Sequence, residues 1–133
     1  MNTNDFLKVL CISVIILLID ITFITLNKNM WEKDIQDIQG SPLNIRFNFG
    51  LIAYILIITG TCVFVLFSNK KTIEEKMKLG FIWGVITYGI FDFTNLSLFS
   101  KYKLKTAITD TIWGGVMIAA SVGLTELIFS LKF

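Results

Sequence analysis

Apolar residues fall in four long runs along the chain, and polar segments separate the runs. Each run has about the 20 residues that an α-helix needs to cross a bilayer. The pattern predicts an all-α integral membrane protein, a four-transmembrane-helix bundle that forms a single domain over residues 1–133. The predicted spans are residues 6–26, 49–67, 79–99 and 107–129.

The joint between the first two spans has a helical pattern of its own. Trp31, Ile35 and Ile38 are spaced so that they share one helical face. Gly40, followed closely by Pro42, is a typical end of a helix. We therefore expect a short helix that lies in the membrane interface, with Trp31 at the level of the lipid headgroups. An ordinary loop is the alternative.

Composition supports a membrane protein. The 133 residues are 54% apolar and only 17% charged, whereas soluble domains carry about 25% charged residues. These values exclude a disordered chain and a coiled coil. The net charge of +2 is too small to indicate an anionic partner, so we expect contact with the lipid bilayer and none with nucleic acid.

The residue types narrow the chemistry further. The chain has no His, which excludes a His-based catalytic triad or metal site within it. Cys11 and Cys62 lie in apolar runs without metal-ligand spacing, so we expect both to behave as small hydrophobic residues. No cofactor fingerprint is present, and we expect neither a cofactor nor a metal.

The sequence gives only a weak signal for the orientation of the chain in the membrane. Four spans place both termini on the same side of the membrane, and six Lys or Arg residues flank each side when Lys132 is included. The positive-inside rule is therefore nearly balanced. The lysine cluster within residues 68–78 favours cytoplasmic termini.

Four acidic residues interrupt the predicted spans: Asp20, Asp92, Asp110 and Glu126. An ionised carboxylate at the centre of a bilayer costs about 2.5–3.5 kcal/mol on insertion scales, so such residues are informative. The three aspartates fall within about 5–11 Å of the same membrane boundary at the helical rise per residue. Glu126 is near the opposite boundary, and we expect its carboxylate to reach the interface.

Small and polar residues form one stripe along each of the last two spans. Small residues four positions apart let another helix approach closely. The short joint makes these spans antiparallel neighbours, so facing stripes would bring Asp92, Asn95 and Asp110 together. The third-span stripe comprises Gly80, Gly84, Tyr88, Asp92 and Asn95. The fourth-span stripe comprises Asp110, Trp113, Gly114, Met117 and Ser121.

No Lys or Arg lies within a span at the depth of the three aspartates. Arg46, at the edge of the second span, is the candidate counter-charge. The aspartates are also compatible with a purely structural role, because Asp and Asn in membrane helices form hydrogen bonds that fix helix register.

The ends of the first and third spans resemble each other. Residues 19–22 (IDIT) align with residues 91–94 (FDFT), and the two spans run in the same direction. Parallel repeats of this kind occur in transporters. Chance similarity between apolar helices is the alternative.

Residues 88–96 (YGIFDFTNL) and 110–114 (DTIWG) resemble the family of small predicted membrane proteins called domain of unknown function 2177. Three positions differ from the family pattern. Phe91 stands where the family has Tyr, Phe93 where it has Leu, and Phe23 where it has Trp. The family has no assigned activity, so the resemblance implies the architecture and a polar site without a function. The matching positions are Tyr88, Asp92, Thr94, Asn95, Asp110, Trp113, Gly114 and Asp20.

These observations favour a protein that binds or transports a small ligand, a cation or a proton, and a homodimer would help four spans to enclose a path. A structural or accessory membrane protein is the alternative, and an enzyme that acts on lipid headgroups is a further one. The candidate ligand-binding residues are Asp20, Tyr88, Asp92, Thr94, Asn95, Asp110 and Trp113, with Gly80, Gly84 and Gly114 as helix-packing residues.

Overall fold

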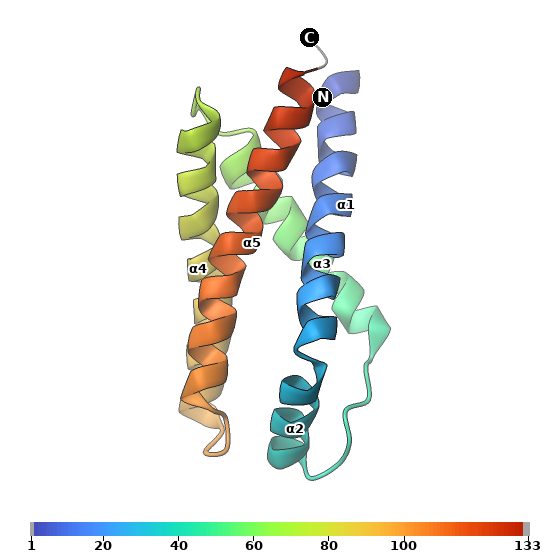
Figure 1. The fold of residues 1–133 in the computed structure, drawn as a ribbon, viewed down its shortest axis with the longest axis vertical. Helices are drawn as coiled ribbons and strands as arrows, with labels where there is room; N and C mark the ends of the chain where they lie inside the picture. Colours follow the sequence, from blue (N-terminus) through green and yellow to red (C-terminus); the bar gives the residue numbers. More distant parts are fainter. Residues whose placement is uncertain (1, 132–133) are drawn as a thin grey trace.

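The computed structural model describes residues 2–131, which are helical and contain no strand. Four helical stretches are long and apolar enough to cross a membrane, which confirms the predicted fold class (Figure 1). Lys132, which contributed to the charge count, lies outside the described residues. The helices are α1 (Thr3–Leu26), α2 (Lys28–Gln39), α3 (Phe47–Thr61), its π-helical continuation η1 (Cys62–Leu66), α4 (Ile73–Leu98) and α5 (Leu104–Ser130).

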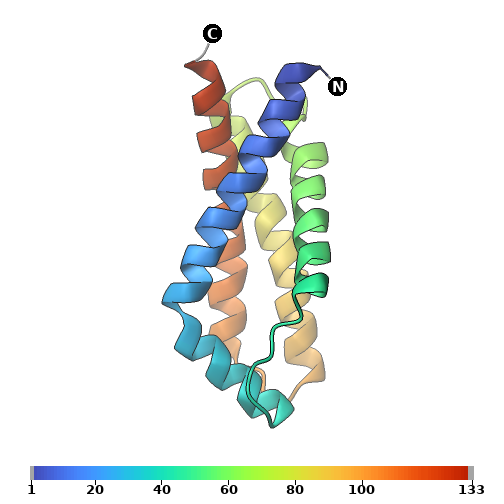
Figure 2. The same ribbon diagram turned by 90° about the vertical axis from the view of Figure 1, so that its right-hand side faces the viewer.

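The four long helical stretches alternate in direction. The start of α1 and the end of α5 lie at one end of the bundle, together with the turn from η1 to α4 (Figure 1). The short helix α2 and the turn from α4 to α5 lie at the opposite end (Figure 2).

The helices extend beyond the apolar runs. α4 begins at Ile73, six residues before the predicted span, because Thr72 and Glu75 form a capping box. The Glu75 N–H donates to Thr72 Oγ1 at 3.1 Å, and the Thr72 N–H donates to the Glu75 carboxylate at 3.1 Å. Hydropathy thus locates the part of a helix that suits lipid, whereas capping residues set the point where the helix begins.

The second span ends in a π-helix, which the sequence pattern did not predict. The Phe67 N–H donates to the Cys62 carbonyl at 3.0 Å, five residues back. The Leu66 carbonyl accepts a hydrogen bond from Lys76 Nζ at 2.8 Å. A side chain from α4 therefore satisfies a backbone group at this end of the span.

The predicted helix in the first joint is present as α2. It follows α1 directly at Asn27, whose side-chain amide donates to the Phe23 carbonyl at 2.9 Å. It ends at Gly40, whose φ of +73° lies in the left-handed region that glycine adopts without strain. Trp31, Ile35 and Ile38 are each half-buried.

α4 and α5 pack against each other along most of their length. A Cβ atom at Gly84 would overlap the backbone of Gly114, and one at Gly114 would overlap the Tyr88 ring. A Cβ at Gly80 would lie 3.4 Å from Ala119 Cα, which is an ordinary contact. Gly84 and Gly114 therefore allow this close approach. Gly115 does so too, because a Cβ there would overlap the Val85 side chain of α4.

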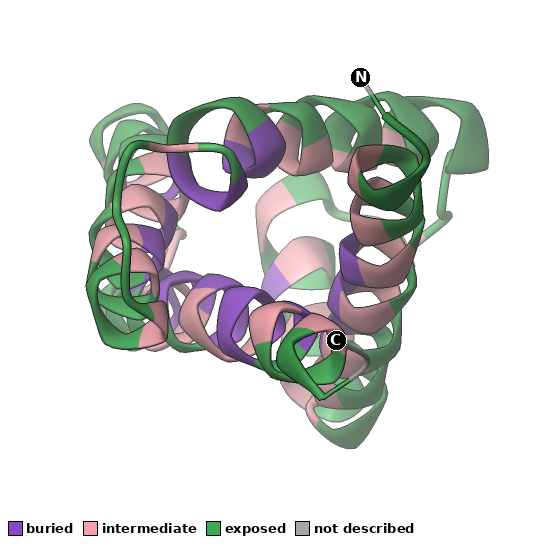
Figure 3. Ribbon diagram, turned by 90° about the horizontal axis from the view of Figure 1, so that it is seen from above, coloured by how far each residue is buried: buried purple, intermediate pink, exposed green. Residues whose placement is uncertain are grey.

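The molecule is apolar outside and partly polar inside. Exposed residues cover the outer faces of the helices, and buried residues turn inward (Figure 3). Leu18, Leu56 and Ile90 are more than 60% exposed, whereas Asp92 and Ser121 are fully buried. An apolar surface of this extent, on helices long enough to span a bilayer, suits contact with lipid. The chain is a multi-pass integral membrane protein.

Candidate functional site

Asp20 is held by side chains from two other helices. The Tyr54 hydroxyl of α3 donates to Asp20 Oδ2 at 2.7 Å, and Trp113 Nε1 of α5 donates to Oδ1 at 2.9 Å. Trp113 also stacks on Phe23, with ring centroids 4.0 Å apart. The carboxylate is 6% exposed and has a donor on each oxygen. Asp20 therefore links α1 to α3 and α5.

A cavity of about 740 Å³ lies beside Asp20, among α1, α3, η1, α4 and α5. The lining residues include no Lys and no Arg. Two carboxylates, from α1 and α5, are thus the charged groups in its wall. The polar side chains that line it are Asp20, Tyr54, Trp83, Thr87, Tyr88 and Asp110.

Asp110 and Tyr88 differ from Asp20 in their bonding. Within residues 2–131, neither the Asp110 carboxylate nor the Tyr88 hydroxyl has a hydrogen-bond partner on another side chain. Asp20 and Asp92 both act electrostatically on Asp110. Asp110 is half-buried, so it is a carboxylate with unused acceptor capacity at a cavity wall.

Asp92 lies outside the lining of this cavity and is fully buried. The Tyr102 hydroxyl donates to Asp92 Oδ1 at 2.6 Å, and the Thr111 hydroxyl donates to Oδ2 at 3.2 Å. Burial and the hydrogen bond to Asp92 raise the pKa of Tyr102, which lies in the turn between α4 and α5, so its hydroxyl remains a donor. Asn95 lies beside Tyr102.

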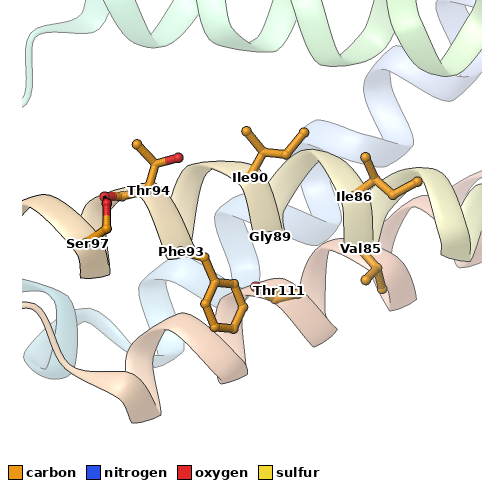
Figure 4. A pocket seen from close by; sticks show the side chains of 8 residues that line it. All are labelled: Val85, Ile86, Gly89, Ile90, Phe93, Thr94, Ser97 and Thr111. Atoms are coloured by element: carbon orange, nitrogen blue, oxygen red, sulfur yellow. Dashed lines mark hydrogen bonds between the residues drawn. The ribbon is translucent and has the colours of Figure 1, made fainter.

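Thr94 is exposed and is not among the residues that line the carboxylate cavity. It lines a shallow hollow of about 640 Å³ on the outer side of α4. Figure 4 shows Ile86, Ile90 and Thr94 along one edge of α4, with Phe93 turned toward α5. The structure therefore groups Asp20, Tyr88, Asp110 and Trp113 near one cavity and places Asp92, Asn95 and Thr94 elsewhere.

Arg46 precedes α3 and is exposed. Its guanidinium lies 4.3 Å from the centroid of the Phe49 ring. Among the described residues it forms no ion pair with Asp20, Asp92 or Asp110. Within residues 2–131, the cavity carboxylates therefore have no cationic partner.

The family model for predicted membrane proteins called DUF2177 matches residues 6–127. The chain belongs to this family. No curated protein and no solved structure matches it. The match covers all four spans of this DUF2177 member, and the family description goes no further than a membrane protein.

Sequence reasoning missed one charged cluster of the DUF2177 chain, where α2 meets the start of α5. Asp34 is 5% exposed and accepts hydrogen bonds from Lys103 Nζ and the Thr106 hydroxyl. Asp37 is 3.3 Å from the same ammonium group. The i, i+3 spacing of Asp34 and Asp37 on a helix was the available signal.

A second cluster lies at the opposite end of the DUF2177 chain. Glu126 accepts hydrogen bonds at 3.0 Å from Lys8 on α1 and from Lys76 on α4. The side chains are 14%, 23% and 13% exposed, respectively, so the carboxylate is enclosed between the two lysines. Neither cluster lines the cavity. Among residues 2–131, no group of three acidic or cysteine side chains is arranged to hold a metal ion.

Proposed function

We propose that this protein binds a small ligand, a cation or a proton at the carboxylate cavity and transports it across the membrane. One observation carries the proposal: Asp20 and Asp110 reach one cavity whose lining includes no Lys or Arg. Carboxylates within membrane helices are costly and commonly mark ion or proton paths. A cavity wall with two carboxylates and no basic side chain favours positive charge.

The two carboxylates have different roles in this proposal. Asp20 receives hydrogen bonds from Tyr54 and Trp113, so its position is fixed. Asp110 has no such donor and is the group that exchanges a ligand. Tyr88 lines the same cavity as Asp110 and supplies a hydroxyl group there.

The bonding of Asp92 favours a structural role for this residue. Both of its oxygens accept hydrogen bonds and its side chain is inaccessible. It links α4 to Tyr102 and to Thr111 on α5, so we assign it to the scaffold of the bundle. Asp92 serves as the comparison for Asp110, because both of its oxygens are bonded within the protein and it acts on Asp110 only through its charge, so its replacement by Asn should have the smaller effect.

The test is cation-driven proton movement in proteoliposomes that contain a pH-sensitive dye. Wild type, Asp110→Asn and Asp92→Asn are compared after addition of Na⁺, K⁺ or tetramethylammonium, with protein-free liposomes as background. We expect at least one cation to change the internal pH in wild type. Asp110→Asn should reduce the rate at least tenfold, and folded Asp92→Asn should stay within threefold of wild type.

Two results would overturn the proposal. Wild type could match protein-free liposomes for each cation and for a proton gradient imposed with K⁺ and valinomycin. Alternatively, Asp110→Asn could transport as fast as wild type. Circular dichroism and size-exclusion chromatography establish that each variant is folded before its rate is interpreted.

A further inference from the structure

We propose that the ligand is an amphipathic cation and that it reaches the cavity from the bilayer, through the opening between α3 and α4. This inference rests on the proposed function and adds the chemical class of the ligand and its route. The cavity has an anionic polar end and an apolar rim, and each part argues for one half of such a ligand.

The size of the cavity favours an organic ligand. Its volume of about 740 Å³ lies within the range of about 300–1,000 Å³ that is typical of sites for small organic molecules. A single dehydrated metal ion would fill only a small part of it. Five apolar side chains also line the cavity, those of Ala53, Leu56, Ile57, Phe64 and Phe91. An inorganic cation would leave these side chains without contacts.

The polar end favours a positively charged headgroup. Asp20 and Asp110 supply negative charge, and the lining also includes Tyr54, Tyr88 and Trp83. Aromatic faces attract ammonium groups, including quaternary ones that cannot donate hydrogen bonds. An anionic headgroup would face two carboxylates without a basic side chain in the lining.

The rim of the cavity faces the lipid. Leu56 of α3, Phe64 of η1 and Phe91 of α4 line the cavity, yet they are 67%, 57% and 59% exposed. In a membrane span, exposure of large apolar side chains means contact with acyl chains. α3 and α4 touch at only a few places, so the opening between them is not closed by packing.

At the η1 end of the cavity, Trp83 of α4 packs against α3 and η1. The Trp83 indole packs where a Cβ of Gly60 would lie, and it also contacts the Phe64 ring, with centroids 4.9 Å apart. A ligand therefore reaches Asp110 past Leu56 and Phe91, with its apolar part against the rim and its charge inside. A hydrophilic cation would have to lose its hydration shell at this apolar rim.

The experiment measures binding to protein in nanodiscs by tryptophan fluorescence, with empty nanodiscs as the lipid background. Three probes distinguish the contribution of the headgroup to binding from that of the tail. Dodecyltrimethylammonium has both features, tetramethylammonium has the same head without the tail, and dodecyl sulfate has the same tail with a negative head. All are used below their critical micelle concentrations. We expect saturable binding of dodecyltrimethylammonium, at least tenfold tighter than that of the other two probes.

Two pairs of variants locate the binding. Asp110→Asn should weaken dodecyltrimethylammonium binding at least tenfold, whereas Asp92→Asn should change it less than threefold. Phe91→Ala should weaken it about fivefold. Phe93→Ala removes an exposed phenyl ring from the same helix, outside the cavity, and should have less than a twofold effect.

The outcomes separate this inference from the proposed function. If tetramethylammonium, Na⁺ or K⁺ acts in an Asp110-dependent manner and dodecyltrimethylammonium does not bind, the cation site stands and the amphipathic ligand is wrong. If dodecyltrimethylammonium binds equally to wild type and Asp110→Asn, the cavity is not its site and the inference fails. If Phe91→Ala and Phe93→Ala behave alike, the route between α3 and α4 is wrong.

Discussion

Glu126 is a carboxylate enclosed between two ammonium groups. Lys8 and Lys76 come from different helices, and each places Nζ 3.0 Å from the Glu126 carboxylate. Lys76 also donates to the Leu66 carbonyl, so α1, α5, α4 and η1 meet at this point. Removing the negative charge would leave two partly buried lysines facing each other without a counter-charge.

We therefore predict that Glu126→Gln lowers the free energy of unfolding by about 1.5–3 kcal/mol, the range of hydrogen bonds to charged groups. Denaturant titration in detergent, followed by circular dichroism, measures this loss. Glu74→Gln is the matched control, because the Glu74–Lys78 pair is exposed on one helix. Its unfolding midpoint should stay within error of wild type. Equal midpoints for Glu126→Gln and wild type would contradict the structural role of the cluster.

At the scale of residues, sequence patterns identify the acids but not their partners. Asp20 and Asp92 stand out because a carboxylate in an apolar run is costly. Tyr54 and Tyr102, which donate to them, lie on another span and in a turn, where a tyrosine is unremarkable. Each aspartate also accepts a hydrogen bond from α5. This parallel is compatible with the predicted repeat, whereas the sequence similarity ends before these partners.

Among the elements, α2 is linked to the start of α5 through Asp34. Burial by itself raises the pKa of Asp34, but the hydrogen bonds from Lys103 and Thr106 outweigh it, with Lys33 adding to the effect. The net pKa of Asp34 is lower than its ordinary value. The hydrogen bond to Asp34 in turn raises the pKa of Lys103. α2 is therefore held to the start of α5 by a charged pair over a broad pH range.

The sign of the pH dependence follows from the lowered pKa. The stabilisation is complete above the ordinary aspartate pKa of about 3.9 and is lost as the pH falls through the lower pKa of the folded protein. We predict that amide hydrogen exchange in α2, corrected for the intrinsic rate, is slow at pH 7 and accelerates below about pH 4.

Asp34→Asn should show fast exchange in α2 already at pH 7, because Asn cannot form the ion pair with Lys103. Asp37→Asn is the control, since Asp37 is half-exposed and contacts Lys103 at 3.3 Å. Exchange in α2 that is as slow in Asp34→Asn as in wild type would show that other contacts hold the helix.

At the scale of elements, the sequence predicted α2 and its end at Gly40, because helical spacing and a glycine stop are local signals. η1 was not predicted, because the Cys62–Leu66 segment is as apolar as an α-helical span. Gly80 and Gly84 were equivalent in the sequence. The structure distinguishes them, because only at Gly84 does the partner backbone occupy the Cβ position.

In the whole molecule, apolar side chains cover the outside and several polar side chains are buried, the reverse of a soluble protein. This distribution made the class, an all-α membrane protein, predictable from the sequence. Lipid requires long apolar runs, and their number and length appear directly in the sequence. The cavity was not predictable, because it depends on how loosely α3 packs against α4. Side-chain packing decides that spacing, and hydropathy does not report it.

The arrangement of the turns leads to a prediction about topology. The turn from η1 to α4 carries Lys70 and Lys71 and lies at the same end of the bundle as the start of α1 (Figure 2). Positively charged turns favour the cytoplasmic side. The joint between α2 and α3 lies at the opposite end. We therefore predict that the termini and the lysine-rich turn share the cytoplasm, and that α2 lies on the outer side.

Single cysteines and a membrane-impermeant maleimide test this topology. In intact cells the reagent should label Ser41→Cys, which follows α2, but not Asn4→Cys or Asn69→Cys. In inside-out vesicles the pattern should reverse, because the latter two positions then face the reagent. Cys11 is half-buried and Cys62 is buried, so the wild type is the control and should remain unlabelled from both sides. Labelling of Asn4→Cys and Asn69→Cys from opposite faces would contradict the four-span arrangement, and labelling of both in intact cells would reverse the orientation.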